Sequence, residues 1–290
     1  MLSKVLYYCR STLAIAVLCG CALYGVTASV VLTLIGKQHL AQWATARCFY
    51  YAMALIMGID VRVENEHYLD HLPYIIISNH QSALDILMLG RMFPQGCTVT
   101  AKKSLKYTPF LGWFMALSGT LFLERANRQK SVDALNQSLD RLKKKKGALW
   151  IFPEGTRSYS TNLNILPFKK GAFHLARQGK LPIVPVVVSN TSTLFNPKWK
   201  VFNRGCIVVR VMKPIPTDNL TAEEVGKFSE DVRDKMIAEL QDLGYCPATN
   251  DTNIPPEARA AELHDDDDET ATALSSENSA ERITTLTKEI

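Results

Sequence analysis

The stretch Asn79-His80-Gln81-Ser82-Ala83-Leu84-Asp85 directly follows the apolar run Y-I-I-I-S at residues 74–78. A short apolar run bounded by polar residues predicts a buried strand. A second stretch, Phe152-Pro153-Glu154-Gly155-Thr156-Arg157-Ser158, follows the run A-L-W-I-F at residues 148–152. Each motif therefore lies where a buried strand ends, which is where α/β proteins bind their ligands.

The rest of the chain from residue 61 onward alternates short apolar runs with longer helical patterns. The strand-like runs are 61–64, 74–78, 98–102, 120–123, 148–152, 183–189 and 207–212. The helix-like stretches are 83–93, 111–117, 129–146, 170–178 and 222–243. Strands that alternate with helices predict an α/β fold with a mostly parallel central sheet flanked by helices.

The N-terminal segment differs from the remainder. Residues 11–35 are apolar and uncharged, and about 20 to 25 such residues suffice for one bilayer crossing. The segment lacks the short apolar core and the small-residue exit of a cleavable signal peptide, so we expect a retained anchor. Residues 38–59 are mixed, and a second buried helix, an interfacial helix and a core helix all fit them. We assign residues 1–60 to a membrane-anchoring helical segment and 61–246 to the α/β domain.

Charge is distributed unevenly along the chain. Residues 248–290 hold eleven acidic and three basic residues, a balance of −8, so residues 1–247 carry +13 of the total of +5. A basic body suits anionic partners such as phosphates or lipid headgroups. The pattern shows no aromatic and basic interleaving of the RNA-binding kind, and we expect no nucleic acid partner. Residues 247–290 cannot form a core and are predicted to be an acidic, disordered tail.

The cysteines argue against a metal site or a disulfide framework. The chain has seven, and they are scattered without a C-x-x-C pair. We therefore expect no bound metal and a reducing compartment for the α/β domain.

His80 and Asp85 form the first candidate site. Residues five apart in one continuous helix point in different directions, so His80 must precede the helix if the two side chains meet. Ser82 and Asp85 have the spacing of a capping box, which would start a helix just after His80. Asp85 could then hold one ring nitrogen and leave the other free as a base. The plainer alternative is that Asp85 only caps the helix and His80 is a loop histidine.

The second motif supplies an anion clamp. The guanidinium of Arg157 can bind two phosphate oxygens at once, although an isolated arginine of this kind is often a surface residue. Gly155 allows a positive φ or a close backbone approach. Glu154 is expected to hold Arg157 or an acceptor hydroxyl rather than a phosphate. Arg125 is a further phosphate-ligand candidate, with Lys102 and Lys103 behind it, and an ion pair with an acid is its plainer alternative.

Four stretches now occur in a set order, namely N-H-Q-S-A-L-D (79–85), G-T-L-F-L-E-R (119–125), F-P-E-G-T-R-S (152–158) and I-V-P-V-V-V (183–188). This order resembles the glycerolipid acyltransferases, specifically the 1-acylglycerol-3-phosphate acyltransferases. The runs T-A-K-K-S-L-K-Y (100–107) and P-F-K-K-G-A-F-H-L-A (167–176) look like the fungal form. Glu124 stands where many members carry Asp, which preserves the charge.

The resemblance implies an enzyme that transfers an acyl chain from acyl-CoA to the sn-2 hydroxyl of lysophosphatidic acid, giving phosphatidic acid and CoA. His80 and Asp85 would be catalytic, and the substrate-binding residues would be Lys102, Lys103, Arg125, Glu154, Gly155, Thr156 and Arg157. No G-x-S-x-G elbow occurs and no cysteine adjoins either motif, so we expect direct transfer by general-base catalysis without an acyl-enzyme. The alternatives are other lysophospholipid acceptors or glycerol 3-phosphate, and, in another class, a non-catalytic membrane lipid-binding protein.

The same resemblance implies acyl-CoA as a co-substrate without any cofactor, and a lipid bilayer as partner. It places the protein in the endoplasmic reticulum membrane with the active site facing the cytosol, with lipid droplets as a further location. The sequons at Asn190 and Asn219 are then expected to carry no glycan.

Overall fold

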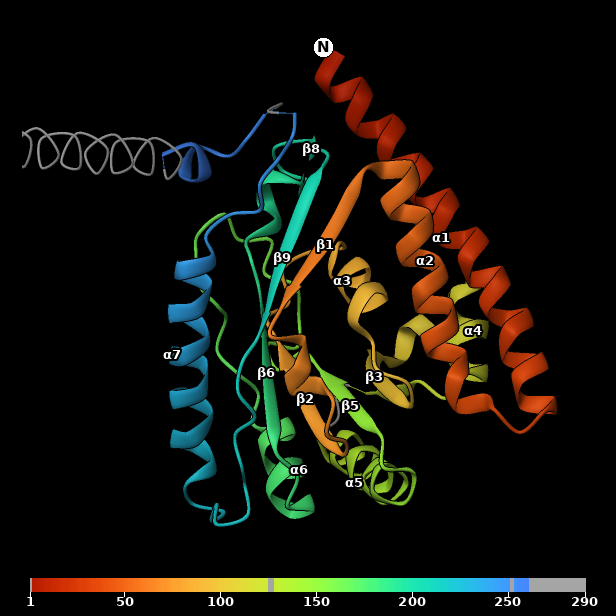
Figure 1. Cartoon of the computed structure of the whole chain (residues 1–290), viewed down its shortest axis with the longest axis vertical. Helices are drawn as coiled ribbons and strands as arrows, with labels where there is room; N and C mark the ends of the chain where they lie inside the picture. Colours follow the sequence, from red (N-terminus) through yellow and green to blue (C-terminus); the bar gives the residue numbers. More distant parts are fainter. Residues whose placement is uncertain (1, 125–127, 251–252, 261–290) are drawn as a thin grey trace, which may run out of the picture.

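The structure is a computed structural model that describes residues 2–124, 128–250 and 253–260. Its centre is a seven-stranded sheet in the order β1-β9-β6-β2-β5-β3-β4 (Figure 1). The strands are β1 (Ile59–Glu64), β2 (Tyr74–Ser78), β3 (Cys97–Lys102), β4 (Leu121–Leu123), β5 (Ala148–Ile151), β6 (Ile183–Val188) and β9 (Gly205–Val211). Neighbouring strands are parallel except β6 and β9, which are antiparallel. The predicted fold class is confirmed.

Helices cover both faces of the sheet. The helices α2 (Ala41–Met57) and α3 (Asp85–Met92) lie on one face, and α5 (Arg128–Lys145), α6 (Gly171–Gly179) and α7 (Val225–Leu243) lie on the other (Figure 1). The alternation of side chains along β2 explains both layers. Tyr74 and Ile76 belong to the core under α2 and α3, whereas Ile75 and Ile77 belong to the core under α5, α6 and α7.

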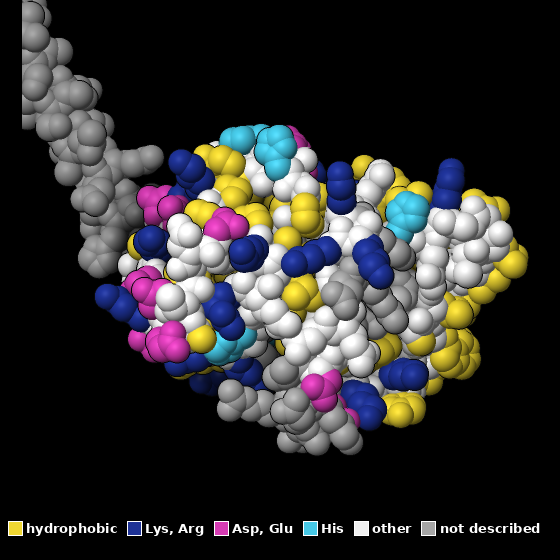
Figure 2. Space-filling model, turned by 90° about the horizontal axis from the view of Figure 1, so that it is seen from below, with side chains coloured by type: hydrophobic (Ala, Val, Ile, Leu, Met, Phe, Trp, Pro, Cys, Tyr) yellow, Lys and Arg dark blue, Asp and Glu magenta, His cyan; other side chains and the backbone are white. Residues whose placement is uncertain are grey.

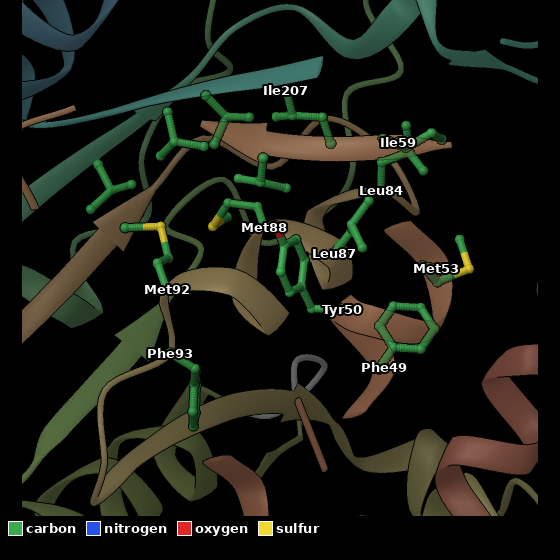
Figure 3. Packing of buried hydrophobic residues seen from close by; sticks show 14 of the residues in the cluster. Phe49, Tyr50, Met53, Ile59, Leu84, Leu87, Met88, Met92, Phe93 and Ile207 are labelled. Carbon is green, nitrogen blue, oxygen red and sulfur yellow. The ribbon is translucent and has the colours of Figure 1, made fainter. Parts of the chain in front are cut away.

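The core under α2 and α3 joins the N-terminal segment to the α/β domain. Met53 of α2 and Leu87 and Met88 of α3 are packed in one cluster with Ile59 and Ile207 of β1 and β9 (Figure 3). The other side of α2 exposes Tyr51, Leu55 and Ile56. Residues 41–57 therefore form a helix that packs on the core along one side and exposes apolar side chains along the other, which fits both the core-helix and the interfacial-helix expectations.

The first helix, α1 (Leu2–Leu34), lies along α2 on the outside of the molecule (Figure 1). Among the described residues it is the helix long and apolar enough to cross a membrane. It also packs against α4 (Leu111–Leu117) through Gly25. An ideal Cβ at Gly25 would lie 2.7 Å from both Phe114 Cδ2 and Thr45 Cγ2, so the glycine permits this three-helix contact.

The helix begins nine residues earlier than the apolar segment suggested, and its first turns rest on the α/β domain. Arg10 is 9% exposed, and its Nη2 donates to the carbonyl oxygen of Met57 at 2.5 Å. Its guanidinium also lies over the Phe202 ring at 5.2 Å, and Tyr7 stacks on Phe195. Arg10 is thus a buried structural cation rather than a charge flanking a free membrane segment.

Short elements that the periodicity did not indicate complete the fold. They are the hairpin of β7 (Phe195–Asn196) and β8 (Val201–Phe202) and the 3₁₀ turns η1 (Gln38–Leu40), η2 (Glu66–Leu69), η3 (Lys103–Tyr107) and η4 (Thr191–Thr193). The hairpin receives the first turns of α1, so it ties the N-terminal helix to the sheet.

The segment that follows Pro247, where the predicted tail begins, makes fixed contacts in its described residues. Cys206 N donates to the carbonyl oxygen of Pro247 at 3.1 Å, and Thr249 N donates to that of Arg204 at 2.9 Å. Ile254 and Ala258 are buried. The reason is that Pro247, Ala248 and Ile254 supply enough apolar and backbone contacts before the acidic run begins. The predicted disorder of 261–290 lies outside the described residues.

Candidate active site

The His80 loop is attached to the carboxyl end of the sheet by two carboxamides. Asn79 Nδ2 donates to the carbonyl oxygen of Val188 at 2.9 Å, and Asn79 Oδ1 accepts from Val188 N at 2.9 Å. Gln81 Nε2 donates to the same carbonyl at 2.9 Å, while Gln81 Oε1 accepts from Thr191 N at 2.8 Å. The side chains on either side of His80 therefore extend the pairing of β2 with β6 and fix the backbone of the histidine.

The predicted contact between His80 and Asp85 is confirmed. His80 Nδ1 and Asp85 Oδ2 are 2.5 Å apart, and Asp85 is 1% exposed. Asp85 Oδ2 also accepts from the backbone N–H groups of Gln81 at 2.9 Å and Ser82 at 3.3 Å. The carboxylate thus holds both the ring and the turn, as in a capping box, although α3 begins at Asp85 itself. This geometry leaves Nε2 as the ring nitrogen available to a substrate.

The ring is further oriented by Phe152, the residue after β5. The two ring centroids are 4.1 Å apart with an interplanar angle of 25°. The His80 side chain is 13% exposed, so the base is partly shielded from water but reachable. An aromatic wall on one side restricts the direction from which a reacting hydroxyl can approach.

Glu154 makes hydrogen bonds to two backbone groups that the sequence did not indicate. Its Oε1 accepts from His80 N at 2.5 Å and its Oε2 accepts from Leu166 N at 3.1 Å, so it holds backbone and not Arg157. The carboxyl is 5% exposed. Burial raises the pKa of Glu154 to about 7, although the two N–H donors act in the opposite direction. Glu154 therefore holds the backbone of His80 in place.

The turn at 155–157 lies directly beside the histidine loop. Ser158 N donates to the carbonyl oxygen of His80 at 2.9 Å, and Tyr159 N donates to that of Gln81 at 2.9 Å. Gly155 has a φ of +72°, as its predicted freedom allowed. Thr156 is exposed, and half-buried Arg157 donates from Nη1 to Tyr159 Oη at 3.4 Å. The structure thus brings the base and the candidate clamp to one edge of the sheet.

Lys102 and Lys103 lie at the end of β3, at the same edge of the sheet. Lys102 ends β3, which is two strands from β2 in the sheet, so about 10 Å separates their ends at the usual strand spacing. Lys103 Nζ forms an ion pair with Glu124 Oε2 at 3.0 Å. Arg125 lies outside the described residues, so its assignment as a phosphate ligand stays a prediction.

Several residues of the site escaped the sequence analysis. They are Asn79 and Gln81, Leu166, Thr191 and Lys169, whose side chain lies against Gly155. The carboxamides flanking His80 were a usable signal, because such groups commonly satisfy backbone groups at a strand end. Within the described residues, no group of three His, Cys, Asp or Glu side chains has the arrangement of a metal site.

Comparisons with known proteins agree with this site. Residues 60–189 match the family model described as Acyltransferase. The chain is 64% identical to the 1-acyl-sn-glycerol-3-phosphate acyltransferase of Saccharomyces cerevisiae over 91% of this chain and 88% of that protein. It is 37% identical to the human 1-acyl-sn-glycerol-3-phosphate acyltransferase beta over 86% of each chain.

A solved structure shares the fold as well. The crystal structure of the 1-acyl-sn-glycerophosphate (LPA) acyltransferase PlsC from Thermotoga maritima superimposes with a TM-score of 0.61 and 25% identity, covering 83% of this chain and 95% of that one. The buried His80–Asp85 pair at the carboxyl edge of a mostly parallel sheet, together with the extent of these matches, shows that the chain belongs to the 1-acyl-sn-glycerol-3-phosphate acyltransferase family and is an acyltransferase.

Proposed function

We propose that this protein transfers a fatty acyl chain from acyl-CoA to the sn-2 hydroxyl of lysophosphatidic acid, giving phosphatidic acid and CoA. The names of the relatives support the acceptor, since those proteins are called 1-acyl-sn-glycerol-3-phosphate acyltransferases. The single observation that carries the proposal is the 2.5 Å contact between His80 Nδ1 and Asp85 Oδ2 beside the Arg157 turn.

The chemistry follows from that contact. Nε2 of His80 accepts the proton as the hydroxyl oxygen attacks the thioester carbonyl, which is a role worth about 10²- to 10⁴-fold in rate. Asp85 stabilises the imidazolium that forms. The new C–O bond replaces the C–S bond, and the proton passes from Nε2 to the departing thiolate of CoA. Neither a metal nor a cofactor is required.

Direct transfer is favoured over an acyl-enzyme. Ser78 and Ser82 are both two positions from His80, and both are buried. Ser82 Oγ is hydrogen-bonded to Leu84 N and Thr191 Oγ1, and Ser78 Oγ accepts from Trp150 Nε1. Among the described residues, the hydrogen bonds of the His80 ring involve Asp85 and not a serine or cysteine. A nucleophile activated by this base would need such a contact.

The remaining substrate contacts are proposed from position and charge. Arg157 suits the phosphate monoester, because its fork of N–H donors can bind two oxygens. Thr156 and Gly155 shape the same turn, and Lys102 extends the positive edge toward β3. Acceptors such as other lysophospholipids or glycerol 3-phosphate remain rivals, and we expect lysophosphatidic acid to give the highest kcat/KM among them.

The test uses purified protein in mixed micelles with oleoyl-CoA and lysophosphatidic acid. We expect release of CoA and formation of phosphatidic acid, and a loss of at least about 10²-fold in kcat for His80→Ala with lysophosphatidic acid still bound. The control is His71→Ala, which changes an exposed histidine elsewhere and should retain activity. Equal turnover of wild type and His80→Ala would refute the base assignment.

The length and apolar composition of α1 indicate that the protein associates with a membrane. Figure 2 shows hydrophobic side chains gathered on the side of the molecule where α1 and α2 lie, with Lys and Arg spread over the rest of that face. We propose that this side contacts the bilayer, and that the membrane is that of the endoplasmic reticulum with the active site toward the cytosol, extending to lipid droplets. Imaging of the tagged protein against markers of both compartments tests the location.

A further inference from the structure

Lys169 lies against the turn that carries Arg157, although it is twelve positions further along the chain. Its backbone N–H donates to the carbonyl oxygen of Pro153 at 2.8 Å, which fixes it beside the second motif. Gly155 has no side chain there, and an ideal Cβ on it would lie 2.7 Å from both Cε and Nζ of Lys169. The ammonium group therefore occupies the space that any other residue at position 155 would fill.

Within the part of the chain that the structure describes, Lys169 has no acidic side chain as an ion-pair partner. The ion pairs found among the described residues involve neither Lys169 nor Arg157. Arg157 and exposed Thr156 thus belong to a turn that is hydrogen-bonded to the His80 backbone, and the Lys169 side chain lies beside that turn. Two cations at one turn attract an anion, and a bound anion would offset the repulsion between them.

We propose that Lys169 is a specificity-determining residue that binds a substrate phosphate together with Arg157. The inference rests on the proposed function, because both substrates of that reaction carry phosphate. A phosphate monoester bears a charge of about −1.5 to −2 at neutral pH and offers three acceptor oxygens, enough for both side chains. Arg157 supplies the planar fork and Lys169 supplies a point charge from the other side of Gly155.

The neighbouring residue provides a matched control. Lys170 has the same charge and is also exposed, but its Nζ lies against Gly226 of α7. An ideal Cβ on that glycine would be 2.9 Å from Lys170 Nζ. It therefore faces away from the turn at 155–157. An effect of Lys169 that Lys170 does not share cannot come from the net charge of the segment.

The first experiment measures binding without turnover. In a His80→Ala background, we expect Lys169→Ala to weaken the equilibrium binding of lysophosphatidic acid by about 10- to 100-fold, as expected for a charge-assisted hydrogen bond. Lys170→Ala should change it less than about twofold, and Lys169→Arg should retain most of the binding since it keeps the charge. Equal binding by Lys169→Ala and its parent, together with the outcome below, would overturn the inference.

The second experiment identifies which phosphate is bound. With active enzyme, kcat/KM is compared for lysophosphatidic acid against the phosphate-free monoacylglycerol, and for acyl-CoA against acyl-pantetheine. A Lys169→Ala defect that disappears with monoacylglycerol assigns Lys169 to the acceptor, and one that disappears with acyl-pantetheine assigns it to CoA. A defect that persists with both phosphate-free substrates, or no defect at all, overturns the inference. Neither result affects the proposed function, which falls only if wild-type enzyme makes no phosphatidic acid.

Discussion

Asp85 and Glu154 are both buried carboxyl residues bonded to the His80 loop, and they act on different parts of it. Asp85 contacts the ring, and Glu154 contacts the backbone N–H of the same residue. The Asp85 contact is local, because the two residues are separated by five positions. The Glu154 contact joins residues 74 positions apart and also depends on Leu166, so the histidine is held by the whole edge of the sheet.

Glu154 should make stability depend on pH. Its pKa is about 7 in the folded protein and near 4.5 when unfolded, because burial disfavours its charged form. Between these values the unfolded chain has lost the proton that the folded protein keeps, so stability falls as the pH rises from about 4.5 to about 7, by up to about 3 kcal/mol.

Glu154→Gln removes this titration. The unfolding free energy of the wild type minus that of the variant should therefore decrease as the pH rises from about 4.5 to about 7, and stay constant above that range. Thermal unfolding in detergent at a series of pH values measures this difference. A difference that stays constant from pH 4.5 to 7.5 would show that burial does not govern this carboxyl.

The limits of sequence-based prediction are visible at these residues. The His80–Asp85 contact followed from spacing and capping chemistry, which are local. Glu154 contacts the backbone of His80, and Lys169 contacts Gly155. The fold brings these residues together, and no short-range sequence pattern predicts the contacts.

Asn190 gives a similar case, since it is buried and its Nδ2 donates to the carbonyl oxygens of Ser160 and Asn162. Its sequon therefore reports nothing about membrane side, and only exposed Asn219 does.

At the scale of elements, strand and helix positions followed the apolar runs closely. The run at 74–78 became β2 without a shift, because a buried strand in a parallel sheet is apolar throughout. The β7–β8 hairpin escaped because its strands are two residues each, too short for a period to be read. The apolar run at 11–35 did not reveal the start of α1, because Arg10 precedes that run and is buried only through its contact with the hairpin.

The packing of α1 is testable with two glycines of the same helix. Gly25→Ala places a methyl group 2.7 Å from Phe114 and Thr45, and should destabilise the protein by about 1–3 kcal/mol through overpacking. Gly20 has nothing within 4 Å of an ideal Cβ, so Gly20→Ala should be neutral or stabilising by up to about 1 kcal/mol. Thermal unfolding of both variants in detergent provides the comparison, and indistinguishable melting temperatures would contradict the three-helix contact.

At the scale of the whole molecule, the described tail is part of the fold up to Ala260. Residues 247–250 are hydrogen-bonded beside β9, and Ile254 and Ala258 are buried. The acidic run begins only at Asp265. The folded part of the chain is thus longer than the composition of residues 247–290 suggests.

Two truncations separate these parts. A chain ending at Ala260 should keep the melting temperature and the activity of the full chain. A chain ending at Asn250 loses buried Ile254 and should be less stable by about 2 kcal/mol, with a lower melting temperature. Identical melting curves for the two truncations would show that residues 251–260 do not contribute to the fold.

The attachment of α1 at both ends has a topological consequence. Tyr7 and Arg10 hold one end to the β7–β8 hairpin and to the last residue of α2, and α4 contacts the other half of the helix. A helix held at both ends by the same domain stays alongside that domain. We therefore propose that α1 meets the bilayer through its outward-facing flank, where its apolar side chains are exposed.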